Sequence, residues 1–84
     1  MNKETIIEKL KGIIKTYVKN HEAYDNLNES NDFITDLQIN SANLVDIILD
    51  IEEEFDIVID NQSMEKMIDI KNALEIIEIK LSEK

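Results

Sequence analysis

Residues 36–60 read DLQINSANLVDIILDIEEEFDIVID, and this stretch carries the clearest pattern in the chain. It holds eight Asp or Glu and no Lys or Arg. Ser41 lies where a polar loop meets an amphipathic segment, and no nearby residue in the sequence could act as a base and make it a nucleophile. We therefore interpret Ser41 as a residue that another protein acts on. This favours a carrier or interaction module over an enzyme, and no catalytic residue is predicted.

The amphipathic segment predicts a helix from about Ser41 to Phe55. At roughly 100° per residue, its apolar side chains form one core-facing stripe made of Leu44, Ile48, Ile51 and Phe55. Leu49 falls about 140° away from Leu44, on the polar face among carboxylates. An apolar side chain with acidic neighbours suits a partner surface that is apolar at its centre and basic at its rim.

Three further helices are predicted from apolar residues at three- and four-residue spacings. They run from about Lys3 to Lys19 with Asn2 as N-cap, from Asn61 to Met67, and from Ile70 to Leu81 with Asp69 as N-cap. The predicted inward-facing positions are Ile6, Ile7, Leu10, Ile13, Ile14, Tyr17 and Val18, then Met64 and Met67, then Ile70, Ala73, Leu74, Ile77 and Leu81. The first helix is also the one basic region of the chain.

Two connections complete the predicted architecture. Residues 20–35 are rich in Asn, Asp and Glu and predict a long surface loop, anchored by Leu27, Phe33 and Ile34. Residues 57–59 are β-branched but have no evident pairing partner, so an extended linker that buries alternate side chains is predicted. The absence of Pro and the single Gly favour helices. One all-α domain spanning residues 1–84 is expected.

Composition narrows the choice of partners and location. The formal net charge of −10 repels nucleic acid and anionic membranes and attracts a basic protein partner. The chain has no cysteine, so a thiol in the function must come from a prosthetic group. Neither a signal peptide nor an apolar run long enough to span a membrane is seen, so a cytoplasmic monomer is expected. The spacing of a calcium-binding loop is absent, and no metal site is predicted.

At this point the chain resembles the acyl carrier proteins. The typical run of that family is D-L-G-x-D-S-L, followed by an acidic helix that ends E-E-x-F and by a short apolar exit. The matching positions here are Asp36, Leu37 and Ser41, then Asp46, Glu52, Glu53 and Phe55, then Ile59, with Phe33 upstream. The order of helices and the loop lengths agree as well. The resemblance therefore implies a four-helix bundle with a long first loop and a short third helix.

Three positions depart from the family pattern. Gln38 replaces the usual Gly, Asn40 replaces the Asp before the serine, and Ala42 replaces the Leu after it. In the family, that Asp helps to bind the magnesium used by the modifying transferase. An Asn can ligate through its carbonyl oxygen but carries no charge. The departures suggest a specialised carrier more than a housekeeping one, and they leave room for a member that is never modified.

The resemblance also implies a function and its residues. A phosphopantetheinyl transferase would attach 4′-phosphopantetheine to Ser41, and the arm would hold acyl groups as thioesters for fatty-acid, polyketide or related lipid and pigment synthesis. The other partners expected are acyl-transferring, ketosynthase or ligase-type enzymes with basic docking surfaces. The implied partner-binding residues are Asp36, Asn40, Asp46, Leu49, Glu52 and Glu53. An acyl pocket between the second helix and the third-helix region would be lined by Phe33, Val45, Ile51, Ile59, Met67 and Ala73.

Two other functional hypotheses remain open from the sequence alone. The first is an unmodified acidic helical adaptor with the carrier fold, which accommodates Asn40 and Ala42 but gives no reason for a serine at position 41. The second is an aminoacyl or peptidyl carrier, which the acidic second helix fits less well. Taken alone, a serine at a helix start is most often an N-cap.

Overall fold

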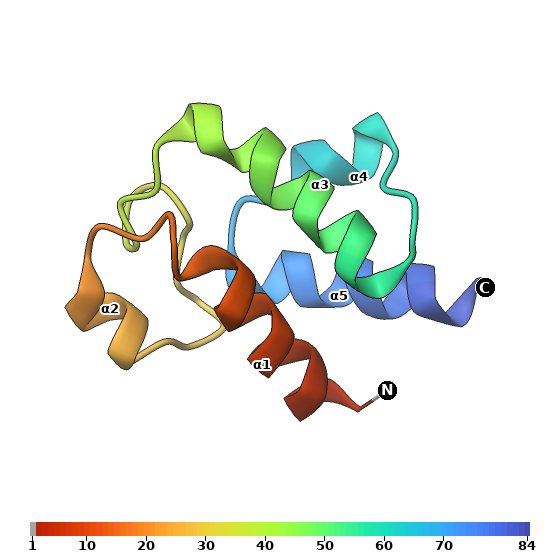
Figure 1. Ribbon diagram of the computed structural model, residues 1–84, viewed down its shortest axis with the longest axis horizontal. Helices are drawn as coiled ribbons and strands as arrows, with labels where there is room; N and C mark the ends of the chain where they lie inside the picture. Colours follow the sequence, from red (N-terminus) through yellow and green to blue (C-terminus); the bar gives the residue numbers. More distant parts are fainter. Residues whose placement is uncertain (1) are drawn as a thin grey trace.

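The computed structural model describes residues 2–84 as an assembly of helices (Figure 1). In chain order these are α1 (Lys3–Ile14), α2 (His21–Asp25), the 3-10 turn η1 (Ser41–Asn43), α3 (Leu44–Phe55), α4 (Asn61–Lys66) and α5 (Ile70–Ser82). Within residues 2–84 there is no β-strand, only an isolated bridge between Asp32 and Asp69. The predicted all-α fold is confirmed. No helix in this part of the chain has the length and apolar character needed to cross a membrane.

The core forms where α1 packs against both α3 and α5 (Figure 1). Its helical residues are Ile6, Leu10 and Ile14 from α1, Ile47, Ile48, Ile51 and Phe55 from α3, and Ile70, Ala73, Leu74, Ile76 and Ile77 from α5. Ile47 and Ile76 are buried but lie outside the predicted stripes. The buried face of α3 and of α5 is therefore wider than predicted. Every buried side chain in residues 2–84 is apolar.

Side-chain caps fix the starts of α1 and α5 as the sequence predicts. The Asn2 side chain accepts a hydrogen bond from the Thr5 N–H at 2.8 Å, and the Asp69 side chain accepts one from the Asn72 N–H at 2.8 Å. Each bond satisfies one of the backbone donors that a helix start leaves without an internal partner. The two predicted N-caps are therefore confirmed.

The first helix is shorter than predicted. The helix ends at Ile14. The Ile14 carbonyl oxygen then accepts from the N–H groups of both Tyr17, at 2.9 Å, and Val18, at 3.1 Å. This tightened turn replaces the last helical turn expected up to Lys19 and still leaves Val18 buried in the core. The Tyr17 hydroxyl donates to Asp50 Oδ2 of α3 at 3.1 Å. Desolvation first, and then this bond, raise the pKa of Tyr17 above its ordinary value.

The predicted loop over residues 20–35 contains the short helix α2, which sequence reasoning missed. Asn20 caps it, because its side chain accepts from the Ala23 N–H at 3.1 Å. Asn is a preferred N-cap, and Glu22 in the first turn suits the helix dipole, so the signal was present in the sequence. The length of α2, five residues, is too short to show a periodic apolar pattern.

One of the three predicted loop anchors is wrong. Ile34 is exposed, whereas Phe33 is buried and Leu27 packs partly against the core. The anchors that the sequence did not reveal are Leu37 and Ile39, both almost completely buried. They lie in an aperiodic stretch, where spacing carries no information on burial.

Backbone hydrogen bonds tie this loop to the rest of the molecule. The Leu37 carbonyl accepts from the N–H groups of Lys19 and Asn20, both at 3.2 Å. The Phe33 N–H donates to the Ile68 carbonyl at 3.1 Å, just before α5. The loop is thus bonded both to the end of the α1 region and to the start of α5, which fixes the direction from which the chain enters η1 and α3.

The linker after α3 has the predicted extended form. Ile57 and Ile59 are 7% and 6% exposed, while Val58 between them is 79% exposed. The chain reverses at Asp56, whose φ of 53° is left-handed. The N–H groups of Asp56 and Ile57 both bond to the Glu52 carbonyl and so close the end of the helix.

Gln38 also has a left-handed backbone, with φ of 57°, at the position where the family usually has Gly. A non-glycine residue in this conformation destabilises the folded state by about 1–2 kcal/mol. Glycine removes that cost, but its greater freedom in the unfolded chain offsets part of the stabilisation. We expect Gln38→Gly to raise the free energy of unfolding by about 0.5–1 kcal/mol. Urea denaturation measures this change.

The matched control is Gln38→Ala, which removes the same polar side chain but keeps the strain. It should leave the free energy of unfolding nearly unchanged. Equal stabilisation by both substitutions would show that the side chain, and not the backbone conformation, is responsible.

Candidate functional site

Ser41 opens η1 at the junction between the long loop and α3, and its side chain is exposed. The residue that caps this turn is Asn40. Its Oδ1 accepts from the Ala42 N–H at 2.9 Å, and its carbonyl accepts from the Asn43 N–H at 2.9 Å. The Ser41 hydroxyl takes part in none of the hydrogen bonds found within residues 2–84. The simple interpretation of Ser41 as an N-cap is therefore wrong, and its hydroxyl is accessible for chemistry.

The loop just before Ser41 is stiffened by two carboxylates. Asp36 Oδ2 accepts from the Asp32 N–H at 2.7 Å, and Asp32 Oδ1 accepts from the N–H groups of Ile34 and Thr35 at 2.8 and 3.1 Å. Asp36 is therefore held by its own loop, although sequence reasoning grouped it with the partner-binding residues. Ala42 is exposed and presents only a methyl group beside the serine. Within residues 2–84 no cluster of His, Cys, Asp or Glu is arranged to hold a metal ion.

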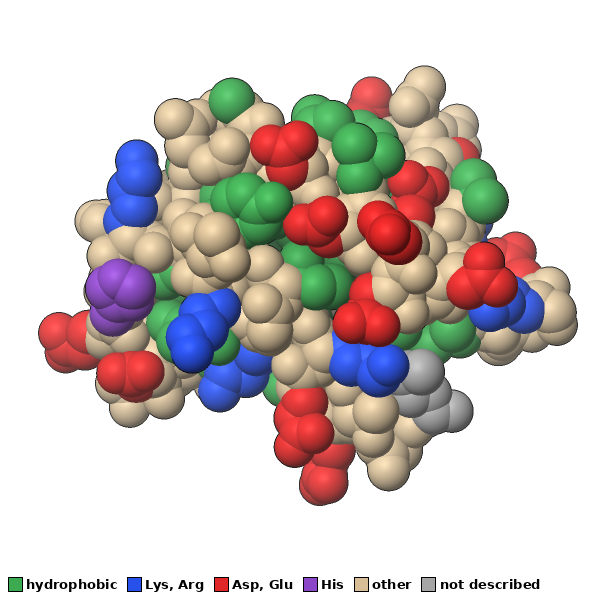
Figure 2. Space-filling view, viewed as in Figure 1, with side chains coloured by type: hydrophobic (Ala, Val, Ile, Leu, Met, Phe, Trp, Pro, Cys, Tyr) green, Lys and Arg blue, Asp and Glu red, His purple; other side chains and the backbone are tan. Residues whose placement is uncertain are grey.

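Acidic side chains gather along the outer face of α3 (Figure 2). Asp46 and Glu53 are exposed, and Leu49 between them is 55% exposed. The structure brings these three of the predicted partner-binding residues to one open surface, which we call the α3 face. A half-exposed leucine flanked by carboxylates is the arrangement that the sequence indicated.

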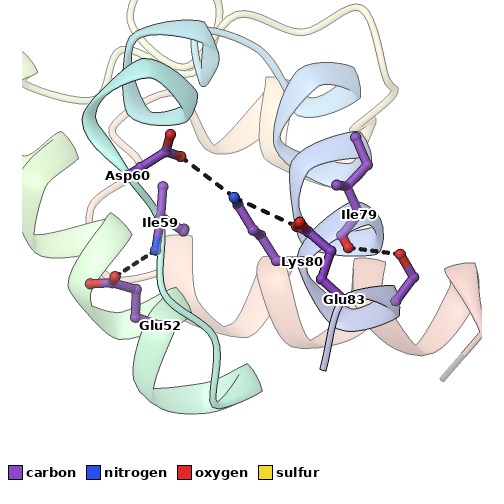
Figure 3. Close-up of polar contacts among 7 residues, drawn as sticks. Glu52, Ile59, Asp60, Ile79, Lys80 and Glu83 are labelled. Atoms are coloured by element: carbon purple, nitrogen blue, oxygen red, sulfur yellow. Dashed lines mark hydrogen bonds and ion pairs between the residues drawn. The ribbon is translucent and has the colours of Figure 1, made fainter.

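Glu52 differs from its neighbours on α3. Its side chain is partly buried, and Oε2 accepts from the Ile59 N–H at 2.7 Å (Figure 3). The carboxylate is therefore engaged inside the molecule, with the linker that follows α3. Sequence reasoning had placed Glu52 among the docking residues and had no means to detect this bond, because the two groups meet only once the chain has reversed at Asp56.

The residues predicted to line an acyl pocket are mostly packed in the core. Phe33, Ile51, Ile59, Met67 and Ala73 are all buried, with Ile51 and Ala73 completely so. Val45 lies instead at the surface, 52% exposed. None of the six lines the hollows of about 430 Å³ that lie beside α1. Because five of the six residues are already buried, a guest that contacts them would require side chains to move.

Comparison with known proteins agrees with this geometry. No protein-family model matches the chain. The acyl carrier protein of Coprothermobacter proteolyticus is 30% identical over 96% of both chains. That of Petrotoga mobilis is 33% identical over 98% of this chain and 94% of its own. That of Desulforapulum autotrophicum is 37% identical over 89% of this chain and 86% of its own. The chain therefore belongs to the acyl carrier protein family.

Because Asn40 and not Ser41 is the cap, we expect substitutions of these two residues to change the free energy of unfolding by different amounts. Asn40→Ala removes the acceptor for the Ala42 N–H and should lower the free energy of unfolding by about 1 kcal/mol. Ser41→Ala removes a hydroxyl without an internal partner and should change it by less than about 0.5 kcal/mol. Urea denaturation of the two variants measures both effects. A larger loss from Ser41→Ala than from Asn40→Ala would reverse the assignment.

Proposed function

We propose that this protein carries acyl groups as thioesters on a 4′-phosphopantetheine arm attached to the Oγ of Ser41. The observation that carries the proposal is that the cap and the exposed hydroxyl at the start of α3 belong to two different residues. Asn40 caps the turn, while Ser41, at the position of the family's modified serine, has an exposed hydroxyl without an internal hydrogen bond. The family membership of the chain supports the same function.

The attachment needs little from the protein itself. The Ser41 oxygen forms a bond to the phosphorus that bears pantetheine in coenzyme A, and the bond from that phosphorus to the nucleotide leaving group breaks. A transferase supplies the base and the metal for this step, as expected for a serine that has no base of its own. When bound, the group supplies a terminal thiol for the thioester. The chain has no cysteine that could compete in thioester exchange.

We further propose that the acyl chain enters between α3 and α4. The buried residues on this path are Phe33, Ile51, Ile59, Met67 and Ala73. The short helix α4 has no buried residue of its own and is therefore easily displaced. Met64 and Met67 are flexible enough to repack around a guest. Val45, at the surface, is left out of this path.

Partner enzymes would dock on the α3 face of Asp46, Leu49 and Glu53. Carboxylates around an exposed leucine complement a partner with basic residues around an apolar pocket. These partners would be the phosphopantetheinyl transferase and acyl-transferring, ketosynthase or ligase-type enzymes, working in the cytoplasm. Asn40 lies beside the serine, but its Oδ1 is occupied as a cap, so an uncharged and engaged residue stands where the family has a magnesium-binding Asp.

Mass spectrometry tests the attachment directly. Incubation of the protein with coenzyme A, Mg²⁺ and a broad-specificity phosphopantetheinyl transferase should add one phosphopantetheinyl mass. Ser41→Ala should abolish the addition, because the acceptor oxygen is gone. Ser63→Ala, at another helical serine, is the matched control and should be modified like the natural protein.

The same experiment separates the competing functions. Modification that persists in Ser41→Ala would contradict the assignment of the site. No modification of the natural protein, together with normal modification of Asn40→Asp, would assign the block to the missing charge. No modification of either protein would favour the unmodified adaptor.

The docking surface is tested by reversing two charges. Asp46→Lys with Glu53→Lys should slow association with the transferase about tenfold at low salt and flatten its salt dependence, because charge complementarity steers association. The control, Glu75→Lys with Glu78→Lys, makes the same change of net charge at two exposed positions of α5. Stopped-flow fluorescence measures both rates. Equal slowing by the two pairs would show that only net charge matters and would remove the α3 face from the proposal.

A further inference from the structure

The linker between α3 and α4 is held at two consecutive residues by two different helices (Figure 3). From α3, Glu52 Oε2 accepts the N–H of Ile59 at 2.7 Å. From α5, Lys80 Nζ lies 3.6 Å from Asp60 Oδ1. Lys80 also lies 3.7 Å from Glu83 Oε1 on its own helical turn. Side chains on both sides of the linker thus converge on the residues that lead into α4.

The helix that follows has few attachments of its own. Residues 61–66 of α4 include none that is buried, and the Asp60 side chain caps no backbone N–H of the helix. Its apolar anchors are Ile59 just before it and Met67 just after it, 6% and 4% exposed, together with Met64 inside it, which is partly buried against the core. Displacement of α4 requires these anchors to move, and Ile59 is the one whose N–H donates to Glu52.

The two contacts differ in strength. A hydrogen bond from a backbone N–H to a partly buried carboxylate is charge-assisted and short, and so is among the stronger kinds. In the Lys80–Asp60 pair the Asp60 carboxylate is exposed and the Lys80 side chain is only partly buried, and ion pairs open to solvent contribute little. The neighbouring Ser63 side chain, and to a smaller extent the ammonium of Lys80, nevertheless lower the pKa of Asp60.

We propose that Glu52 and Lys80 form a clasp on the linker, with Glu52 as its main part, and that this clasp sets how often α4 moves away from α3. Glu52 is then a positioning residue for the α3–α4 gap and not a docking residue. The consequence for an acyl chain entering that gap rests on the proposed function. The clasp itself does not, because all of its atoms belong to the unmodified chain.

Amide hydrogen exchange of the unmodified protein tests the clasp. Glu52→Ala should speed exchange of the α4 amides, such as that of Met64, about tenfold or more, because a charge-assisted bond is lost. The Leu10 amide in α1 should change much less. Glu52→Gln keeps a carbonyl oxygen within reach of the Ile59 N–H and should restore part of the protection, because a neutral acceptor forms a weaker bond than a carboxylate. Glu53→Ala, one position along on α3, is the control and should exchange like the natural protein. Lys80→Met should speed exchange of the α4 amides only about two- to threefold, because an ion pair open to solvent contributes little.

Three outcomes would overturn the proposal. The first is an unchanged α4 exchange rate in Glu52→Ala. The second is acceleration of the α1 and α4 amides by the same factor, which would mean general destabilisation and no local control. The third is equal acceleration in Glu53→Ala and Glu52→Ala, which would make the loss of a carboxylate on α3, and not the bond to the Ile59 N–H, responsible. None of these results depends on whether Ser41 is modified.

Discussion

The packing of an aliphatic core, most of it isoleucine, is the interaction on which the rest of the structure depends. A chain of 84 residues buries a smaller share of its surface than a larger domain does, so three long helices alone give a small core. The loop between α2 and η1 adds Phe33, Leu37 and Ile39 to it. Because these side chains are buried, the loop has a fixed course. That course delivers Asn40 and Ser41 to the start of α3 in a defined orientation.

At the candidate site, neighbouring polar residues divide into those whose side chains bond to the backbone and those whose side chains are exposed. Asn40 is engaged as a cap, while Ser41 beside it is exposed. Glu52 is engaged with the linker, while Glu53 beside it is exposed. In each pair the engaged residue has a backbone N–H within reach and the other has not. Alternating roles of this kind let a small domain present reactive and charged groups without leaving its own backbone donors unsatisfied.

The departures from the family pattern acquire physical meaning in the structure. The Gly usual at position 38 fits a left-handed backbone, and Gln38 adopts that conformation at a cost in stability. Asn40 preserves the cap that an Asp would also supply, since either side chain offers an oxygen to the Ala42 N–H. What it gives up is the charge next to the serine. The cap is therefore kept, and the change falls on the charge beside Ser41.

The sequence alone determined the features that depend on residues close together in the chain. Three of the four predicted stripe residues of α3, the caps of α1 and α5 and the alternating burial of residues 57–59 follow from spacing and from capping preferences, and were predicted. The family and the candidate serine followed from a motif. Only the tertiary structure decided that Ile34 is exposed while Leu37 and Ile39 are buried, that Val45 lies at the surface, and that Glu52 bonds to Ile59. Burial in an aperiodic loop depends on which distant segments pack against it, and so does the hydrogen-bond partner of a helix carboxylate. Local periodicity in the sequence does not specify those contacts.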